Sequence, residues 1–115
     1  MAIGAINNPW KEENITVTVD TTKIKFTNWG GVTAKKIGNI VFISFSGVKA
    51  ISAISTATSV ATISGVTAKT SVYAPIFAFG GSTYGIASIE GNNSVMFNGM
   101  SSTSAECFVQ FVVPV

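Results

Sequence analysis

The chain has no histidine, no arginine and a single cysteine, Cys107, among its 115 residues. The absence of histidine excludes Ser-His-Asp and Cys-His nucleophilic catalysis and metal sites with histidine ligands. One cysteine cannot form a disulfide within the chain, and in an apolar strand it usually behaves as a small hydrophobic residue. Arginine is the preferred side chain for bidentate contacts to phosphates and bases, so its absence argues against a nucleic-acid partner.

Charged residues are scarce as well. They make up 10% of the chain, against about 25% in a typical soluble domain, while hydrophobic residues make up 47%. No stretch approaches the ~18 apolar residues of a membrane-spanning helix, so membrane insertion is not expected. A small domain with so few ionic groups is expected to cover part of its surface with copies of itself, which predicts an oligomer. The alternative is a monomer whose polar surface consists of serine and threonine.

The length fits one domain over residues 1–115 that folds without a metal or disulfide. Residues 1–13 are interpreted as an extended N-terminal segment. The first residues lack the basic start and long apolar core of a signal peptide, so none is expected.

The dominant hydrophobic period is two residues, which is typical of strands with one buried face. Ile15, Val17 and Val19 alternate with polar residues, and Ile24 and Phe26 follow in the same way. Further strands are expected over 32–37, 40–46, 59–64, 72–79, 84–89, 94–98 and 106–113.

Turn signals separate these strands. Gly38-Asn39 between two strand-like runs predicts a two-residue hairpin of type II′. Pro75 lacks an amide donor and predicts an edge position or a bulge. Residues 48–57 are interpreted as a loop with a short helix, and the strand at 40–46 as central and buried on both faces. About nine short strands without a long helix predict an all-β fold, specifically an antiparallel, jelly-roll-like β-sandwich, with a barrel as the alternative.

The acidic residues give weak support to catalysis. Glycoside hydrolysis needs two carboxylates at a defined separation. Glu12 and Glu13 lie together in the N-terminal segment and Glu90 lies in a turn, which favours solvated or hydrogen-bonding roles. No calcium-binding loop and no phosphate-binding glycine loop is present, so no metal and no cofactor are predicted. A depolymerase with carboxylates at subunit boundaries is the enzymatic alternative to a non-enzymatic domain.

Among the functional classes considered, recognition of a saccharide remains. It needs a flat aromatic face for the apolar side of the sugar ring and amides or carboxylates for the hydroxyls. For each aromatic candidate the alternative is core packing or a subunit contact, and for the Asn pair it is turn geometry. The predicted ligand-binding residues are Asn28, Trp29, Tyr84, Glu90, Asn92 and Asn93, and Trp10 is a further aromatic candidate.

A strand that ends in Lys35-Lys36 and the Gly38-Asn39 turn, followed by the apolar residues 40–46, resembles a segment of the C-terminal heads of phage tail fibres and baseplate receptor-binding proteins. Residues 32–47, VTAKKIGNIVFISFSG, resemble a strand of that family that ends in a basic residue and a glycine turn before an apolar strand. Residues 60–64, 72–76 and 85–92 are similar to its later strands. In place of the Leu-Pro pair frequent in the family, this chain has Ile63-Ser64-Gly65.

The resemblance covers about residues 30–115 and implies a function. It implies a β-sandwich or jelly-roll head that forms a homotrimer, lies at the tail tip of a virion outside the cell, and binds host cell-surface polysaccharide. The alternative is a structural virion module that only joins subunits.

Overall fold

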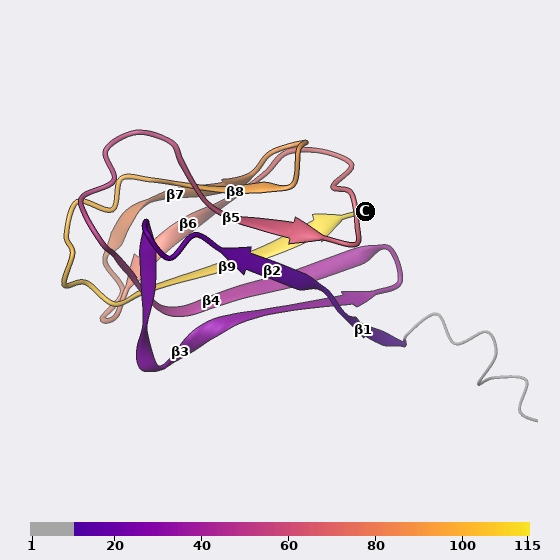
Figure 1. Ribbon diagram of the computed structural model, residues 1–115, viewed down its shortest axis with the longest axis horizontal. Coiled ribbons are helices and arrows are strands. Elements are labelled where there is room, and N and C mark those ends of the chain that lie inside the picture. The colour runs from indigo at the N-terminus through magenta and orange to yellow at the C-terminus, as the bar shows by residue number, and fades with distance from the viewer. Residues whose placement is uncertain (1–10) are drawn as a thin grey trace, which may run out of the picture.

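The computed structural model describes residues 11–115, so Trp10 and most of the expected N-terminal segment lie outside the described residues. The described chain is all-β and consists of nine antiparallel strands in one sheet that is nearly closed into a barrel (Figure 1). The strands are β1 (Glu12–Asn14), β2 (Thr16–Val19), β3 (Ile24–Ile37), β4 (Ile40–Ala50), β5 (Thr58–Ser64), β6 (Val72–Ala78), β7 (Thr83–Ile89), β8 (Ser94–Asn98) and β9 (Cys107–Pro114).

The prediction of an all-β antiparallel fold is confirmed, whereas a sandwich or jelly roll is not. The strand order is β1-β3-β4-β9-β6-β7-β8-β5-β2. The N-terminal strands lie at the two ends of this order, although they are neighbours in sequence. Beyond the paired strands, the Ile15 amide donates to the Ala34 carbonyl of β3 and the Asp20 amide donates to the Val60 carbonyl of β5. One short segment therefore passes from β3 to β5 and brings the two edges of the sheet together.

The core lies inside this barrel and follows the alternation of the strands. Val41, Ile43 and Phe45 of β4 point inward and are almost completely buried. The Phe45 ring contacts Phe97 of β8 edge to face, with 5.4 Å between ring centroids, and stacks on Phe26 of β3. Full burial of such side chains is the main stabilising term, about 1.5–3 kcal/mol each.

The hairpin predicted at Gly38-Asn39 is confirmed. Ile37 and Ile40 are directly paired, so the loop has two residues. Gly38 has a φ of 61°, while Asn39 is not among the residues with positive φ. A positive φ at the first loop residue alone is the requirement of a type II′ turn, and glycine adopts it without steric cost.

The short helix expected within residues 48–57 is absent from the structure. β4 continues to Ala50, and residues 51–57 form a loop. The ladder between β4 and β9 is shifted between Phe45 and Val48, and Gly47 there has a φ of 61°. This bulge moves the buried side chains of β4 from odd to even positions, so Val48 and Ala50 face the core.

Pro75 lies in an interior strand, but the ladder is interrupted beside it. β6 pairs with β9 only at Phe77–Phe108 and Ala78–Cys107, and its register with β7 shifts between Ile76 and Phe77. The missing amide of Pro75 is tolerated because β6 makes no ladder contact with β9 at that residue.

Candidate binding site

The structure places the six predicted ligand-binding residues in three separate locations. Asn28 and Trp29 lie in the irregular middle of β3, and Tyr84 lies at the start of β7, half-buried against the core. Glu90, Asn92 and Asn93 lie in the turn after β7. A strand of seven residues spans roughly 20 Å, so the turn is remote from Tyr84. The six residues do not form one site in a single chain.

The polar groups of the β7–β8 turn have partners within the chain. The Asn93 side chain donates to the Val66 carbonyl over 2.7 Å and accepts from the Ala68 amide over 3.0 Å. Asn93 has a φ of 63°, a left-handed conformation that asparagine tolerates. The Asn92 side chain accepts from the Ser94 amide, and the Glu90 carboxylate accepts from two serine hydroxyls. These contacts fix the turn against the β5–β6 loop, and ligand binding by these residues stays a prediction.

Asn28 and Trp29 line an open groove together with residues that sequence reasoning did not include. We name it the Trp29 groove. It has a volume of about 410 Å³ and is lined by Lys25, Phe26, Thr27, Asn28, Trp29, Lys49 and Glu106.

Local strand geometry creates the Trp29 groove. The β3–β4 register shifts between Phe26 and Gly31, so residues 27–30 bulge out of the ladder. A Cβ at Gly30 would collide with the Ser46 carbonyl, and a Cβ at Gly47 would lie 3.1 Å from the Trp29 ring. Only two glycines at this crossing let the two backbones and the indole approach so closely.

Trp29 packs against one aromatic neighbour and keeps an accessible surface. Its ring centroid lies 5.7 Å from that of Phe108 on β9, and Phe108 in turn contacts Phe79 at 6.1 Å. The indole remains 54% exposed. A ring that is fixed by neighbours and open to solvent is suited to stacking on the apolar side of a sugar.

A second surface feature is an apolar face on the outside of β4, β9, β6 and β7, which are adjacent in the sheet. Phe42 pairs with Val112, and Phe77 pairs with Phe108, so these side chains share one side of the sheet. We define the apolar face by its exposed or half-buried members Phe42, Tyr73, Pro75, Phe77, Ile86, Phe108 and Val112.

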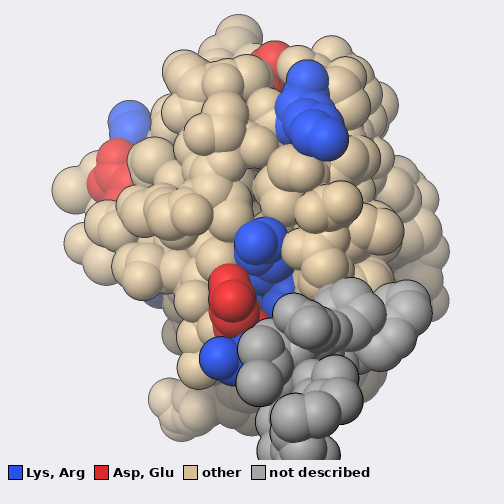
Figure 2. All heavy atoms as spheres, turned by 90° about the vertical axis from the view of Figure 1, so that its right-hand side faces the viewer, with Lys and Arg blue, Asp and Glu red and all other residues tan. Residues whose placement is uncertain are grey.

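The apolar face is unusual in its exposure and in its lack of charge. Its exposed large side chains are between 42% (Phe77) and 71% (Tyr73) accessible. Lys49, at one end, is the single charged residue of the four strands. Phe42 was expected in a strand buried on both faces, and in the single chain that expectation is wrong. Elsewhere, charged side chains are also few, as Figure 2 shows for the end of the barrel seen from the right of Figure 1.

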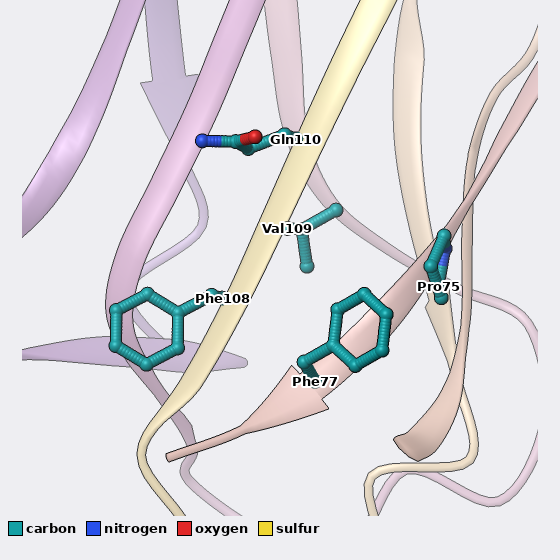
Figure 3. A pocket seen from close by; sticks show the side chains of 5 residues that line it. All are labelled: Pro75, Phe77, Phe108, Val109 and Gln110. Atoms are coloured by element: carbon teal, nitrogen blue, oxygen red, sulfur yellow. The ribbon is translucent and has the colours of Figure 1, made fainter. Parts of the chain in front are cut away.

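A hollow lies on the apolar face where β6 and β9 diverge. Its volume is about 530 Å³, and it is lined by Pro75, Phe77, Phe108, Val109 and Gln110. Figure 3 shows the Phe77 ring between β6 and β9, with Phe108 and Gln110 on the other side of β9. The hollow offers aromatic walls and one amide, which suits a protruding apolar side chain more than a charged ligand.

The remaining titratable groups give no sign of a reactive centre. Burial raises the pKa of the Cys107 thiol, which points into the core. The Thr22 hydroxyl and then the Thr22 amide lower the pKa of Asp20 in an exposed turn. Glu12 and Glu13 face Lys35 and Lys36 of β3 at 3.3 and 4.0 Å. Within residues 11–115 no group of histidine, cysteine or acidic residues is placed to hold a metal ion.

No helix of the described residues has the length and apolar character needed to cross a membrane. No family model, curated protein or solved structure matches the chain.

Proposed function

We propose that this chain is a non-enzymatic recognition domain that binds a cell-surface saccharide as a homotrimer, in the manner of a phage receptor-binding head at the tail tip of a virion. The observation that carries the proposal is the Trp29 groove. There, an accessible indole lies beside the Asn28 amide and the Glu106 carboxylate in one open depression. Stacking on an aromatic ring and hydrogen bonds from planar polar groups are the two contacts that sugar recognition requires.

The apolar face supports the oligomeric part of the proposal, with a second copy of the chain as its occupant. Seven side chains of roughly 100–250 Å² each, about half exposed, leave on the order of 700 Å² of apolar surface. The largest patch of a typical monomer is about 300–600 Å², whereas a stable interface buries about 800 Å² per partner.

The charge distribution favours a second copy over an unrelated charged partner. The face has no cluster of one sign, so two copies meet without repulsion, and Lys49 lies at its margin. The hollow between β6 and β9 gives a recess for a side chain of the neighbouring copy.

Three groove sites on one trimer would raise the apparent affinity for a repeated saccharide. The resemblance also implies a two-layered jelly roll, which is an arrangement of antiparallel strands closely related to this barrel. We include the jelly roll in the proposal as the finer description of the fold.

The binding part is tested with an array of cell-surface glycans and the full chain. We expect the wild type to bind at least one saccharide, and Trp29→Ala to weaken that binding by about tenfold, since stacking on an aromatic ring contributes on the order of 1.5 kcal/mol. Ile40→Ala is the control because Ile40 is an exposed large hydrophobic residue outside both the groove and the apolar face, at the end of β4 opposite to Lys49.

Two results separate the alternatives. An absence of binding together with a stable trimer favours the structural module that only joins subunits, an alternative that the apolar face by itself supports. Equal losses for Trp29→Ala and Ile40→Ala would remove the groove from the proposal, because the two variants then share a nonspecific effect.

A further inference from the structure

Two lysines of the Trp29 groove occupy positions at which their charges do not stabilise the fold. Lys25 of β3 and Lys49 of β4 are directly opposite each other in the ladder. Their strand neighbours Ile24, Val48 and Ala50 are buried, so both lysines lie on the outer side of the sheet. Like charges directly opposite on neighbouring strands destabilise a sheet.

Neither lysine has a carboxylate partner among the described residues. The ion pairs there join Lys35 to Glu12 and Lys36 to Glu13, at the other end of the β3–β4 hairpin. Glu106 lines the same groove but lies outside ion-pair distance of both lysines. Two positive charges are therefore held together, beside an accessible aromatic ring, without an internal counter-charge in contact.

One residue of the groove has a hydroxyl group that is not exposed to it. The Thr27 hydroxyl oxygen is buried and has no hydrogen-bond partner, and Thr27 lines the groove. This oxygen lies so close to Gly30 and Gly47 that a Cβ on either glycine would collide with it, so it belongs to the close packing of β3 on β4 and not to the surface open to a ligand.

We propose that the Trp29 groove selects an acidic saccharide, one whose sugar ring carries a carboxylate. The ligand carboxylate lies between the Lys25 and Lys49 ammonium groups, and the apolar side of its ring stacks on Trp29. Asn28 and Glu106 contact the hydroxyls. The inference rests on the proposed saccharide binding and adds the chemical class of the ligand.

The charge balance favours a carboxylate over a phosphate monoester. Two lysines and Glu106 leave a net charge of +1 in the groove (2 − 1 = 1). One carboxylate neutralises this charge, whereas a phosphate monoester carries about −1.5 to −2 at neutral pH. The bidentate arginine contacts that phosphate groups favour are also missing, because the chain has no arginine.

The test compares acidic sugars with their own neutral forms. Titration calorimetry on the full chain uses oligosaccharides of glucuronate, galacturonate and N-acetylneuraminate, each with its carboxyl-reduced counterpart. We expect at least one acidic member to bind about tenfold more tightly than its reduced form, as for a hydrogen bond to a charged group. That affinity should fall as salt is added.

Substitutions of single lysines test which residues select the acidic ligand. Lys25→Ala and Lys49→Ala should each weaken the acidic ligand by about tenfold and leave the reduced one unchanged, and Lys49→Arg should retain binding. Lys69→Ala is the matched control. Lys69 donates its backbone amide to Pro114, at the end of β9 opposite to Cys107 and the groove.

The outcomes separate this inference from the proposed function. Binding of the reduced sugars with equal affinity, lost in Trp29→Ala, overturns the acidic selection but keeps saccharide recognition. If Lys69→Ala weakens the acidic ligand as much as Lys25→Ala and Lys49→Ala do, the acidic selection is also overturned, because the attraction then depends on the positive charge of the whole chain and not on the groove. If no member of either series binds and the glycan array is empty, both proposals fail.

Discussion

At the scale of single residues, glycines without side chains decide how closely the strands approach. A Cβ at Gly85 of β7 would overlap the Asn98 carbonyl oxygen of β8 and lie 3.0 Å from the Gly99 Cα. The φ of Gly85 is not positive, so the requirement is space and not backbone conformation. Gly91, in the turn after β7, has no atom within 4 Å of such a Cβ.

These two glycines give a matched pair for a stability test. Gly85→Ala should lower the free energy of unfolding by about 1–3 kcal/mol, since the strands must separate to admit the methyl group. Gly91→Ala should leave it unchanged or raise it slightly, because alanine reduces the freedom of the unfolded chain. Urea denaturation measures both, and coincident midpoints would show that β7 and β8 are not in such close contact.

Residue patterns alone identified some of these features. The Gly38-Asn39 loop and the alternation at Ile24 and Phe26 predict local geometry, because each depends on residues that are adjacent in sequence. The opposition of Lys25 and Lys49 does not follow from the sequence. It depends on the register of two strands that both contain bulges, and a register is fixed by the whole sheet.

At the scale of elements, the bulge at Gly47 and the short N-terminal strands determine the architecture. The bulge changed which side chains of β4 face inward, so Val48 and Ala50 were not recognised as strand residues. Closure of the sheet by β1 and β2 was also not foreseen. A barrel and a sandwich share the same alternation, and they differ only in which strands pair at the edges.

The segment that closes the barrel should also be its least stable part. β2 has four residues whose inward side chains are only half-buried, whereas inward side chains of β9 are almost fully buried. Regions with few buried apolar contacts open most readily. Amide hydrogen exchange should therefore show lower average protection in β2 than in β9, with β5 between them. Uniform protection across the three strands would contradict closure by a weak segment.

At the scale of the whole molecule, the scarcity of charge and the apolar face have a common explanation. A face of four strands with one charged residue is costly in water, and packing against neighbouring copies around the proposed trimer axis would remove it from solvent. The Trp29 groove lies beside this face, since Trp29 contacts Phe108. We therefore expect subunit assembly and saccharide binding on neighbouring surfaces. A substitution in one surface can then be tested for its effect on the function of the other.

A variant pair distinguishes the apolar face from the rest of the surface. Phe77→Asp places a charge beside the hollow between β6 and β9 and should dissociate the subunits, because a buried unpaired charge costs several kcal/mol. Thr62→Asp places the same charge on the exposed side of β5 and should leave the assembly intact.

The mass of the wild-type domain in solution tests the central claim most directly. Sedimentation equilibrium at micromolar concentration should give three times the chain mass of 11.9 kDa. Phe77→Asp should give the mass of one chain and Thr62→Asp that of the wild type. A wild-type domain that sediments as a single chain at this concentration would contradict the account, because its apolar face would then be stable in water without a partner.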